Sequence, residues 1–127
     1  MTQRRRISPR SKFEAEVGFT RALRVGDRII VAGTVDDRPE PPLDAGEQAD
    51  RIYQLIREYI EELGGTMADV VRVRMFVTNI DDAEKVSAAF TKHLKETCPT
   101  GTLVAISALY RPEILVEIEA EAIVSAN

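Results

Sequence analysis

The segment ILVEIEAEAIV, residues 114–124, decides the fold because its side chains alternate in kind. Apolar residues at every second position point to one face of a strand, while Glu117, Glu119 and Glu121 point to the other. The pattern therefore predicts a strand that is buried on one side. Three carboxylates at roughly 6.8 Å spacing repel one another unless a neighbouring strand supplies positive charge.

Residues 70–77, VVRVRMFV, alternate in the same way and supply that charge. We expect Arg72 and Arg74 to lie beside the glutamates, on a sheet face that carries no helix. The same face bears three apolar side chains, Phe76, Leu115 and Ile123. A mixed face of this kind is either a solvated surface or a contact between subunits. The opposite, buried face is expected to hold Val71, Val73, Met75 and Val77.

Two helices are predicted upstream of the final strand. The first begins at Asp44, which forms a capping-box pattern with Glu47, and ends at Gly64-Gly65 after a stripe of apolar residues at helical spacing. The second begins at Asp81-Asp82 and ends before Pro99. The proline-rich stretch over residues 36–43 is expected to be a loop, because proline fits neither a helix interior nor a central strand.

Short strands are predicted towards both ends of the chain. Residues 18–23 and 28–32 form a hairpin around Gly26-Asp27, and residues 102–109 precede the final strand. The order ββαβαββ predicts an α+β fold, with a mixed sheet that carries two helices on one face. The length of 127 residues corresponds to a single domain over residues 1–127.

The charge balance restricts the partners. The chain has 17 Lys and Arg against 21 Asp and Glu, a net charge of −4, so nucleic acid is a disfavoured partner. No stretch approaches the ~20 apolar residues of a membrane span, and we expect no membrane association. Basic residues near the N-terminus predict a flexible, solvated tail over residues 1–12, with an RNA or lipid contact as the alternative. These residues are Arg4, Arg5, Arg6, Arg10 and Lys12.

One cysteine and one histidine limit the chemistry. Cys98 alone cannot form an internal disulfide, which fits a cytoplasmic protein. His93 alone excludes both a ribonuclease that uses a histidine pair and a clustered His/Cys zinc site, so we expect no metal or other cofactor. We expect His93 to pack within the second helix and Cys98 to be a buried, unreactive thiol.

Three parts of the chain resemble the Rid family, whose members are also called YjgF or endoribonuclease L-PSP proteins. They are GFTRALRVGDRIIVAGTV at 18–35, GGTMADVVRVRMFVTNIDD at 64–82, and PTGTLVAISAL with ILVEIEAEAIV at 99–109 and 114–124. The resemblance implies a chorismate-mutase-like fold and a homotrimer with small-molecule clefts between subunits. It also implies hydrolysis of reactive imines and enamines to keto acids and ammonia.

The resemblance further implies a site. Glu117 occupies the position of the family's proposed water-activating glutamate, and backbone amides near Gly33 and Leu103 are implied to hold a ligand oxygen. The family's arginine, which grips the substrate carboxylate by a bidentate pair, is replaced by Gly101. Arg21 and Arg111 are alternative sources of the missing charge, and the sequence places neither.

Three more positions of the implied site depart from the family pattern. Phe19 stands where a tyrosine is usual, Ala32 where a serine is common, and Ser87 where the archetype has an asparagine. The cleft is therefore expected to be less polar and less favourable to anions.

Three functions remain open from the sequence. The first is an imine or enamine deaminase with altered or weak activity, in which Glu117 activates water. The second is a non-catalytic module that binds a small metabolite, in which Glu117 is a structural carboxylate paired with arginine. The third, a ribonuclease, is the least favoured because the domain is acidic and holds a single histidine.

Overall fold

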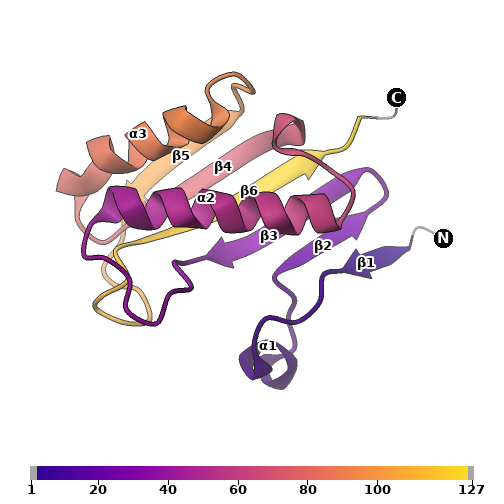
Figure 1. Ribbon diagram of the computed structural model, residues 1–127, viewed down its shortest axis with the longest axis horizontal. Helices are drawn as coiled ribbons and strands as arrows, with labels where there is room; N and C mark the ends of the chain where they lie inside the picture. Colours follow the sequence, from indigo (N-terminus) through magenta and orange to yellow (C-terminus); the bar gives the residue numbers. More distant parts are fainter. Residues whose placement is uncertain (1–2, 126–127) are drawn as a thin grey trace.

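Six strands form one mixed sheet in the computed structural model, which describes residues 3–125 (Figure 1). The strands lie side by side in the order β1-β2-β3-β6-β4-β5. β4 and β5 are parallel, and every other neighbouring pair is antiparallel. The strands are β1 (Arg4–Arg6), β2 (Ala22–Val25), β3 (Arg28–Thr34), β4 (Val70–Val77), β5 (Thr100–Ala105) and β6 (Val116–Ile123).

Two helices, α2 (Ala45–Glu62) and α3 (Ala83–Leu94), lie side by side on one face of this sheet (Figure 1). The predicted α+β fold with two helices on one face is thereby confirmed. A short helix, α1 (Lys12–Val17), stands apart from them beyond the end of the sheet (Figure 1). Two 3₁₀ turns, η1 (Met67–Asp69) and η2 (Ile80–Asp82), flank β4. None of the helices within residues 3–125 has the length and apolar character needed to cross a membrane.

The ends of α2 follow from the capping residues in the sequence. The Asp44 side chain accepts a hydrogen bond from the backbone N–H of Glu47 at 2.9 Å, which satisfies a donor that the first helical turn leaves free. At the other end Gly64 has a φ of +86°, a conformation that glycine adopts without steric cost. The sequence therefore predicts the position of this helix correctly.

The core lies between α2 and the helix-covered face of the sheet. Ile52, Ile56 and Ile60 of α2 are fully buried, and so are Ile29 of β3 and Ile118 of β6. Isoleucine side chains of this kind each contribute about 1.5–3 kcal/mol when they are removed from water. This layer fixes the sheet beneath α2 and therefore the direction in which the opposite face points.

The opposite face carries the predicted ion pairs between β6 and its neighbours. Arg74 Nε lies 3.1 Å from Glu119, and Arg72 and Arg74 both lie 3.9 Å from Glu121. Arg28 of β3 adds the shortest contact, 2.8 Å to Glu121, which the sequence reading did not anticipate. Glu121 is thus held between strands on both sides of β6.

The N-terminal segment differs from the flexible tail expected over residues 1–12, of which residues 1 and 2 lie outside the described part. Arg4, Arg5 and Arg6 form β1, which pairs with β2, and Ile7 is only 4% exposed. Lys12 begins α1. The expectation fails because pairing with β2 and burial of Ile7 order a segment whose local composition is dominated by charge.

Two side chains lie on the opposite side from the expected one. Val71 is exposed, because the pairing of β4 with β6 shifts between Val70 and Arg72 and turns Val70 inward instead. Cys98 was expected to be buried and is exposed, in a left-handed turn with a φ of 53° that connects α3 to β5. The expectations that β4 alternates strictly and that the Cys98 thiol is buried were therefore both wrong.

Candidate functional site

A cavity of about 620 Å³ opens where α1, the β2–β3 region and the loop before β6 meet. Glu117, Gly33 and Phe19, three of the residues singled out from the sequence, line it together. Arg21, Phe13 and Tyr110 line it as well. One cavity therefore combines a carboxylate, a guanidinium and several aromatic rings.

Glu117 is the acidic side chain on β6 that faces this cavity. Its carboxylate is partly buried and makes no ion pair within residues 3–125, unlike Glu119 and Glu121 on the same strand. Burial raises the pKa of the Glu117 carboxyl, the nearby Arg21 charge partly offsets that increase, and Glu119 adds to it. A carboxylate with a raised pKa and no fixed partner is suited to accept and return a proton.

Gly33 provides the space that the Glu117 carboxylate occupies. A Cβ atom at position 33 would lie 2.5 Å from Oε2 and 2.9 Å from Cδ of Glu117. Contacts this short do not occur between real side chains, so only glycine at this position allows the observed placement. Gly33 sits where the pairing of β3 with β6 shifts, between Val31 and Thr34, and this irregularity brings the two strands' residues into the cavity.

Arg21 is fixed against the same irregular segment by its backbone and by its side chain. The backbone N–H of Ala32 donates to the Arg21 carbonyl at 2.9 Å, and Arg21 Nη1 donates to the Gly33 carbonyl at 2.8 Å. The guanidinium carbon lies 4.9 Å from the centre of the Phe19 ring, within the range of a cation–π contact. The sequence raised Arg21 only as an alternative, since nothing in it reveals this irregularity.

Aromatic side chains surround the opening of the cavity. The rings of Phe13 and Phe19 meet edge to face at 5.9 Å, and Phe13 lies 6.3 Å from Tyr110. Phe13 is 51% exposed and Tyr110 is 91% exposed. Sequence reasoning missed both, because one belongs to an unpredicted helix and the other to a turn.

The remaining predicted residues lie elsewhere in the chain. Ser87 is on the exposed side of α3, and Gly101 and Leu103 are on β5, which is separated from β3 by β6 and β4. Ala32 lines a different, small hollow on the helix-free face, beside Arg74 and Glu119. A single chain therefore brings Phe19, Gly33 and Glu117 together and does not bring Ser87, Gly101 or Leu103 to them.

Position 101, where the resemblance implies a missing arginine, faces α3. A Cβ atom there would make ordinary contacts of 3.5 Å with the ring of Phe90. Gly101 is therefore not required by close packing, in contrast to Gly33.

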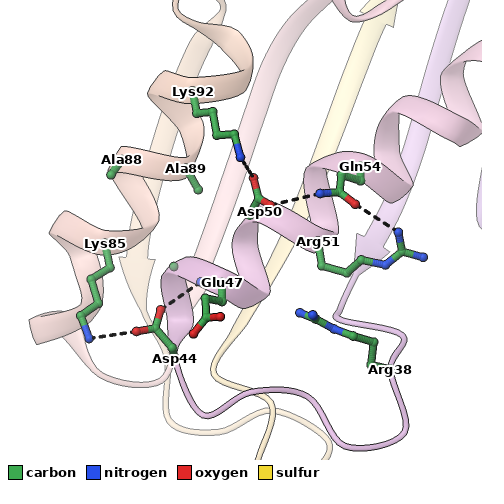
Figure 2. A pocket seen from close by; sticks show the side chains of 11 residues that line it. Arg38, Asp44, Glu47, Asp50, Arg51, Gln54, Lys85, Ala88, Ala89 and Lys92 are labelled. Atoms are coloured by element: carbon green, nitrogen blue, oxygen red, sulfur yellow. Dashed lines mark hydrogen bonds and ion pairs between the residues drawn. The ribbon is translucent and has the colours of Figure 1, made fainter.

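A second cavity, of about 570 Å³, lies between α2, α3 and the loop that precedes α2. Figure 2 shows Lys85 and Lys92 of α3 reaching Asp44 and Asp50 of the α2 region, at 3.3 and 2.9 Å. His93 also contacts Asp50, at 2.7 Å, so it packs in α3 as expected. These charges are already paired across the helices. We therefore interpret the ion pairs that line this cavity as structural contacts that hold α2 against α3.

Comparisons with known proteins identify the family of this chain and agree with its fold. The family described as Endoribonuclease L-PSP matches residues 9–124. A RutC family protein of Pyrococcus abyssi is 31% identical over 106 residues, covering 80% of this chain and 83% of that protein. The 2-iminobutanoate/2-iminopropanoate deaminase of Escherichia coli is 28% identical over 112 residues, covering 83% and 86%.

A solved structure gives the same picture in three dimensions. A Mycobacterium tuberculosis protein, a member of the YjgF/YER057c/UK114 family, superposes with a TM-score of 0.89 at 35% identity. The match covers 96% of this chain and all of that one.

Proposed function

Because this chain belongs to the Endoribonuclease L-PSP family, also called the Rid or YjgF family, we propose that it hydrolyses imines or enamines in the cavity that contains Glu117. One observation carries the proposal. The carboxylate at the position of the family's water-activating glutamate lies in a cavity, is partly buried, has a raised pKa and makes no ion pair with any residue of 3–125. A purely structural carboxylate on this face would be paired, as Glu119 and Glu121 are.

The proposed reaction begins when a water molecule attacks the imine carbon. The Glu117 carboxylate accepts one proton from this water as the new carbon–oxygen bond forms, and the imine nitrogen takes up a proton from solvent, which the final loss of the hydroxyl proton returns. The protonated carboxyl then returns its proton to the nitrogen of the resulting amino alcohol. The carbon–nitrogen bond breaks, ammonia leaves, and the remaining hydroxyl loses its proton to give the carbonyl product.

The proposal includes a homotrimer with one cleft at each subunit contact. Apolar side chains remain exposed among the ion pairs of the helix-free face, including Ile30 and Val104 at 40% exposure each. Association through this face would bury them.

Activity on the family's archetypal small substrates is expected to be altered or weak. An arginine at position 101 is absent, and a lost hydrogen bond to a charged group costs about 1.5–3 kcal/mol. That corresponds to roughly tenfold to more than a hundredfold in affinity. The ribonuclease alternative receives no support, because His93 on α3 contacts Asp50 on α2 and does not line the cavity that contains Glu117.

The experiment that tests the proposal is a coupled imine-hydrolysis assay. An amino-acid oxidase generates imines from a panel of amino acids, and semicarbazide trapping reports how fast each imine disappears. Wild type should accelerate the loss, Glu117→Gln should abolish the acceleration, and Glu119→Gln on the same strand should retain it. If Glu117→Gln retains the wild-type rate, the hydrolase is wrong. If the wild type is inert but a ligand raises its Tm, a non-catalytic binding module replaces the hydrolase as the function of this chain.

A further inference from the structure

Of the arginines that line the cavity, one makes no ion pair with a carboxylate of residues 3–125. Among residues 3–125, Arg10 pairs with Glu62 at 2.8 Å and Arg111 pairs with Glu113 at 3.3 Å. Arg21 makes no ion pair, although Glu117 lines the same cavity. Two opposite charges that share a cavity without touching leave room for a ligand that bridges them.

The guanidinium of Arg21 is held in place before any ligand arrives. One of its five N–H groups is used on the Gly33 carbonyl, and its planar face rests on Phe19. Its Nε is buried and has no hydrogen-bond acceptor in the described part of the chain. A buried donor without an acceptor is costly, and the remaining N–H groups on Nη1 and Nη2 are the ones that an anion in the cavity could engage.

Beside its charged and polar residues the cavity has an aromatic part, and it is larger than a small acid needs. The Phe13, Phe19 and Tyr110 rings line the side that opens to solvent. A cavity of about 620 Å³ falls within the range that accommodates drug-sized ligands. An apolar group of several carbons is the chemistry that these rings would bury.

We infer that Arg21 is the anion-binding group of this site, and that its ligands are carboxylates that bear a sizeable apolar side chain. Arg21 lies at the start of β2 and contacts the irregular segment of β3. It thereby supplies the positive charge that position 101 lacks. This inference rests on the proposed function for the reaction, since the carboxylate at Arg21 would present an adjacent imine carbon to Glu117. The preference for an anion with an apolar side chain goes beyond the proposed function, and it can be measured without turnover.

The first test measures binding to the wild-type protein by calorimetry, with three unreactive probes. 3-Phenylpropanoate carries both features, 3-phenylpropanamide lacks the charge, and propanoate lacks the ring. We expect 3-phenylpropanoate to bind at least about tenfold more tightly than either of the others. Equal affinity for the acid and the amide overturns the role of a cation, and equal affinity for both acids overturns the apolar part.

The second test compares variants of two arginines that line the same cavity. Arg21→Gln should lose at least about tenfold in affinity for 3-phenylpropanoate, and Arg21→Lys, which keeps the charge, should recover part of it. Arg111→Gln, which removes a cation already paired with Glu113, should stay within about threefold of wild type. If Arg111→Gln has the large effect and Arg21→Gln the small one, the assignment to Arg21 is wrong.

If the wild type hydrolyses imines, kinetics with two substrates distinguish a role of Arg21 in ligand binding from a purely structural role. The imine produced from phenylalanine carries a carboxylate, whereas the imine that an amine oxidase produces from phenethylamine does not. Arg21→Gln should raise KM for the first and leave kcat/KM for the second within about threefold. An equal loss on both imines means that Arg21 only shapes the Gly33 segment. A wild type that binds 3-phenylpropanoate but turns over neither imine refutes the hydrolase alone.

Discussion

Gly33 on β3 and Glu117 on β6 occupy one space between them: the carboxylate lies where a side chain at position 33 would begin. The two residues belong to neighbouring antiparallel strands whose pairing shifts at this point. The shift leaves the backbone of β3 close to the Glu117 side chain and directs that side chain into the cavity. The position of the Glu117 carboxylate in the proposed site therefore depends on the absence of a side chain at Gly33 on the adjacent strand.

Gly33→Ala should displace the Glu117 carboxylate. A methyl group 2.5 Å from Oε2 forces the Glu117 side chain to move, and the end of a flexible, partly buried side chain can do so at little cost in stability. We expect less than about 1 kcal/mol of lost stability in urea unfolding and at least a tenfold loss of kcat for imine hydrolysis. Gly101→Ala is the matched control for stability, because its methyl group makes ordinary contacts with Phe90 and should leave urea unfolding unchanged. Full activity in Gly33→Ala would contradict this placement of Glu117.

Glu117→Gln should stabilise the chain at neutral pH while it removes activity. Burial raises the pKa of the carboxyl in the folded state, so the folded chain binds a proton more readily than the unfolded chain. Stability therefore falls as pH rises through the raised pKa, and the full penalty is present above it. We expect the glutamine variant to be more stable at pH 7.5 by less than about 1 kcal/mol, because the group is only partly buried.

The same comparison at low pH provides the check on the cause. Below about pH 3 the carboxyl is protonated in both states, and the difference between wild type and Glu117→Gln should vanish. Urea unfolding at equal protein concentration and at both pH values measures it. A stabilisation that persists unchanged at low pH would mean that packing, and not the buried charge, is responsible.

Val104→Glu should dissociate the proposed trimer. Val104 lies on the helix-free face of β5, next to Phe76 of β4, and is 40% exposed in the single chain. A charge buried without a partner in a subunit contact is strongly unfavourable. Light scattering at micromolar concentration should give three times the chain mass of 14.1 kDa for wild type and the chain mass for the variant.

Leu43→Glu is the control for that experiment. Leu43 is a more exposed apolar residue, and it lies in the loop before α2 and away from the helix-free face. This variant should keep the wild-type mass. A wild type that is monomeric under these conditions removes both the trimer and the clefts between subunits from the proposal.

Tyr53→Phe should leave the fold as stable as wild type or stabilise it by about 1 kcal/mol. Tyr53 is fully buried between α2 and α3, and its hydroxyl has no hydrogen-bond partner within residues 3–125. Burial also raises the pKa of this hydroxyl. Removing an unsatisfied buried polar atom while the ring is kept costs little packing and relieves a desolvation penalty. Tyr53→Ala, which removes the ring, should instead cost about 3–5 kcal/mol in the same unfolding measurement.

The elements that the sequence predicts well are those whose signal is local. β4 and β6 alternate clearly, and the ends of α2 carry a capping aspartate and a glycine, so these parts of the fold follow from residues close together in the chain. β1 and α1 were missed because β1 exists only through its pairing with β2. A run of three arginines gives no periodicity from which such a strand can be predicted.

The same distinction applies to the site. Glu117, Gly33 and Phe19 were placed together through the resemblance, and they share one cavity. The orientation of Arg21 depends on the irregular pairing of β3 with β6, which involves residues more than eighty positions apart. Tyr110 and Phe13 contribute from a turn and a short helix, whose positions no alternation or capping signal determines.

The two outer strands of the sheet differ in a way that bears on self-assembly into fibres. β1 carries three exposed arginines, whereas β5, with the sequence TGTLVA, carries no charge. Positive charge on an edge strand repels the same strand of another molecule, while an uncharged edge accepts a further strand. Unlimited edge-to-edge growth of a sheet requires two edge strands that can each accept another strand, and the described part of this chain has one. Edge-to-edge pairing through β5 alone would therefore end after two molecules, and the arginines of β1 would oppose unlimited growth of the sheet.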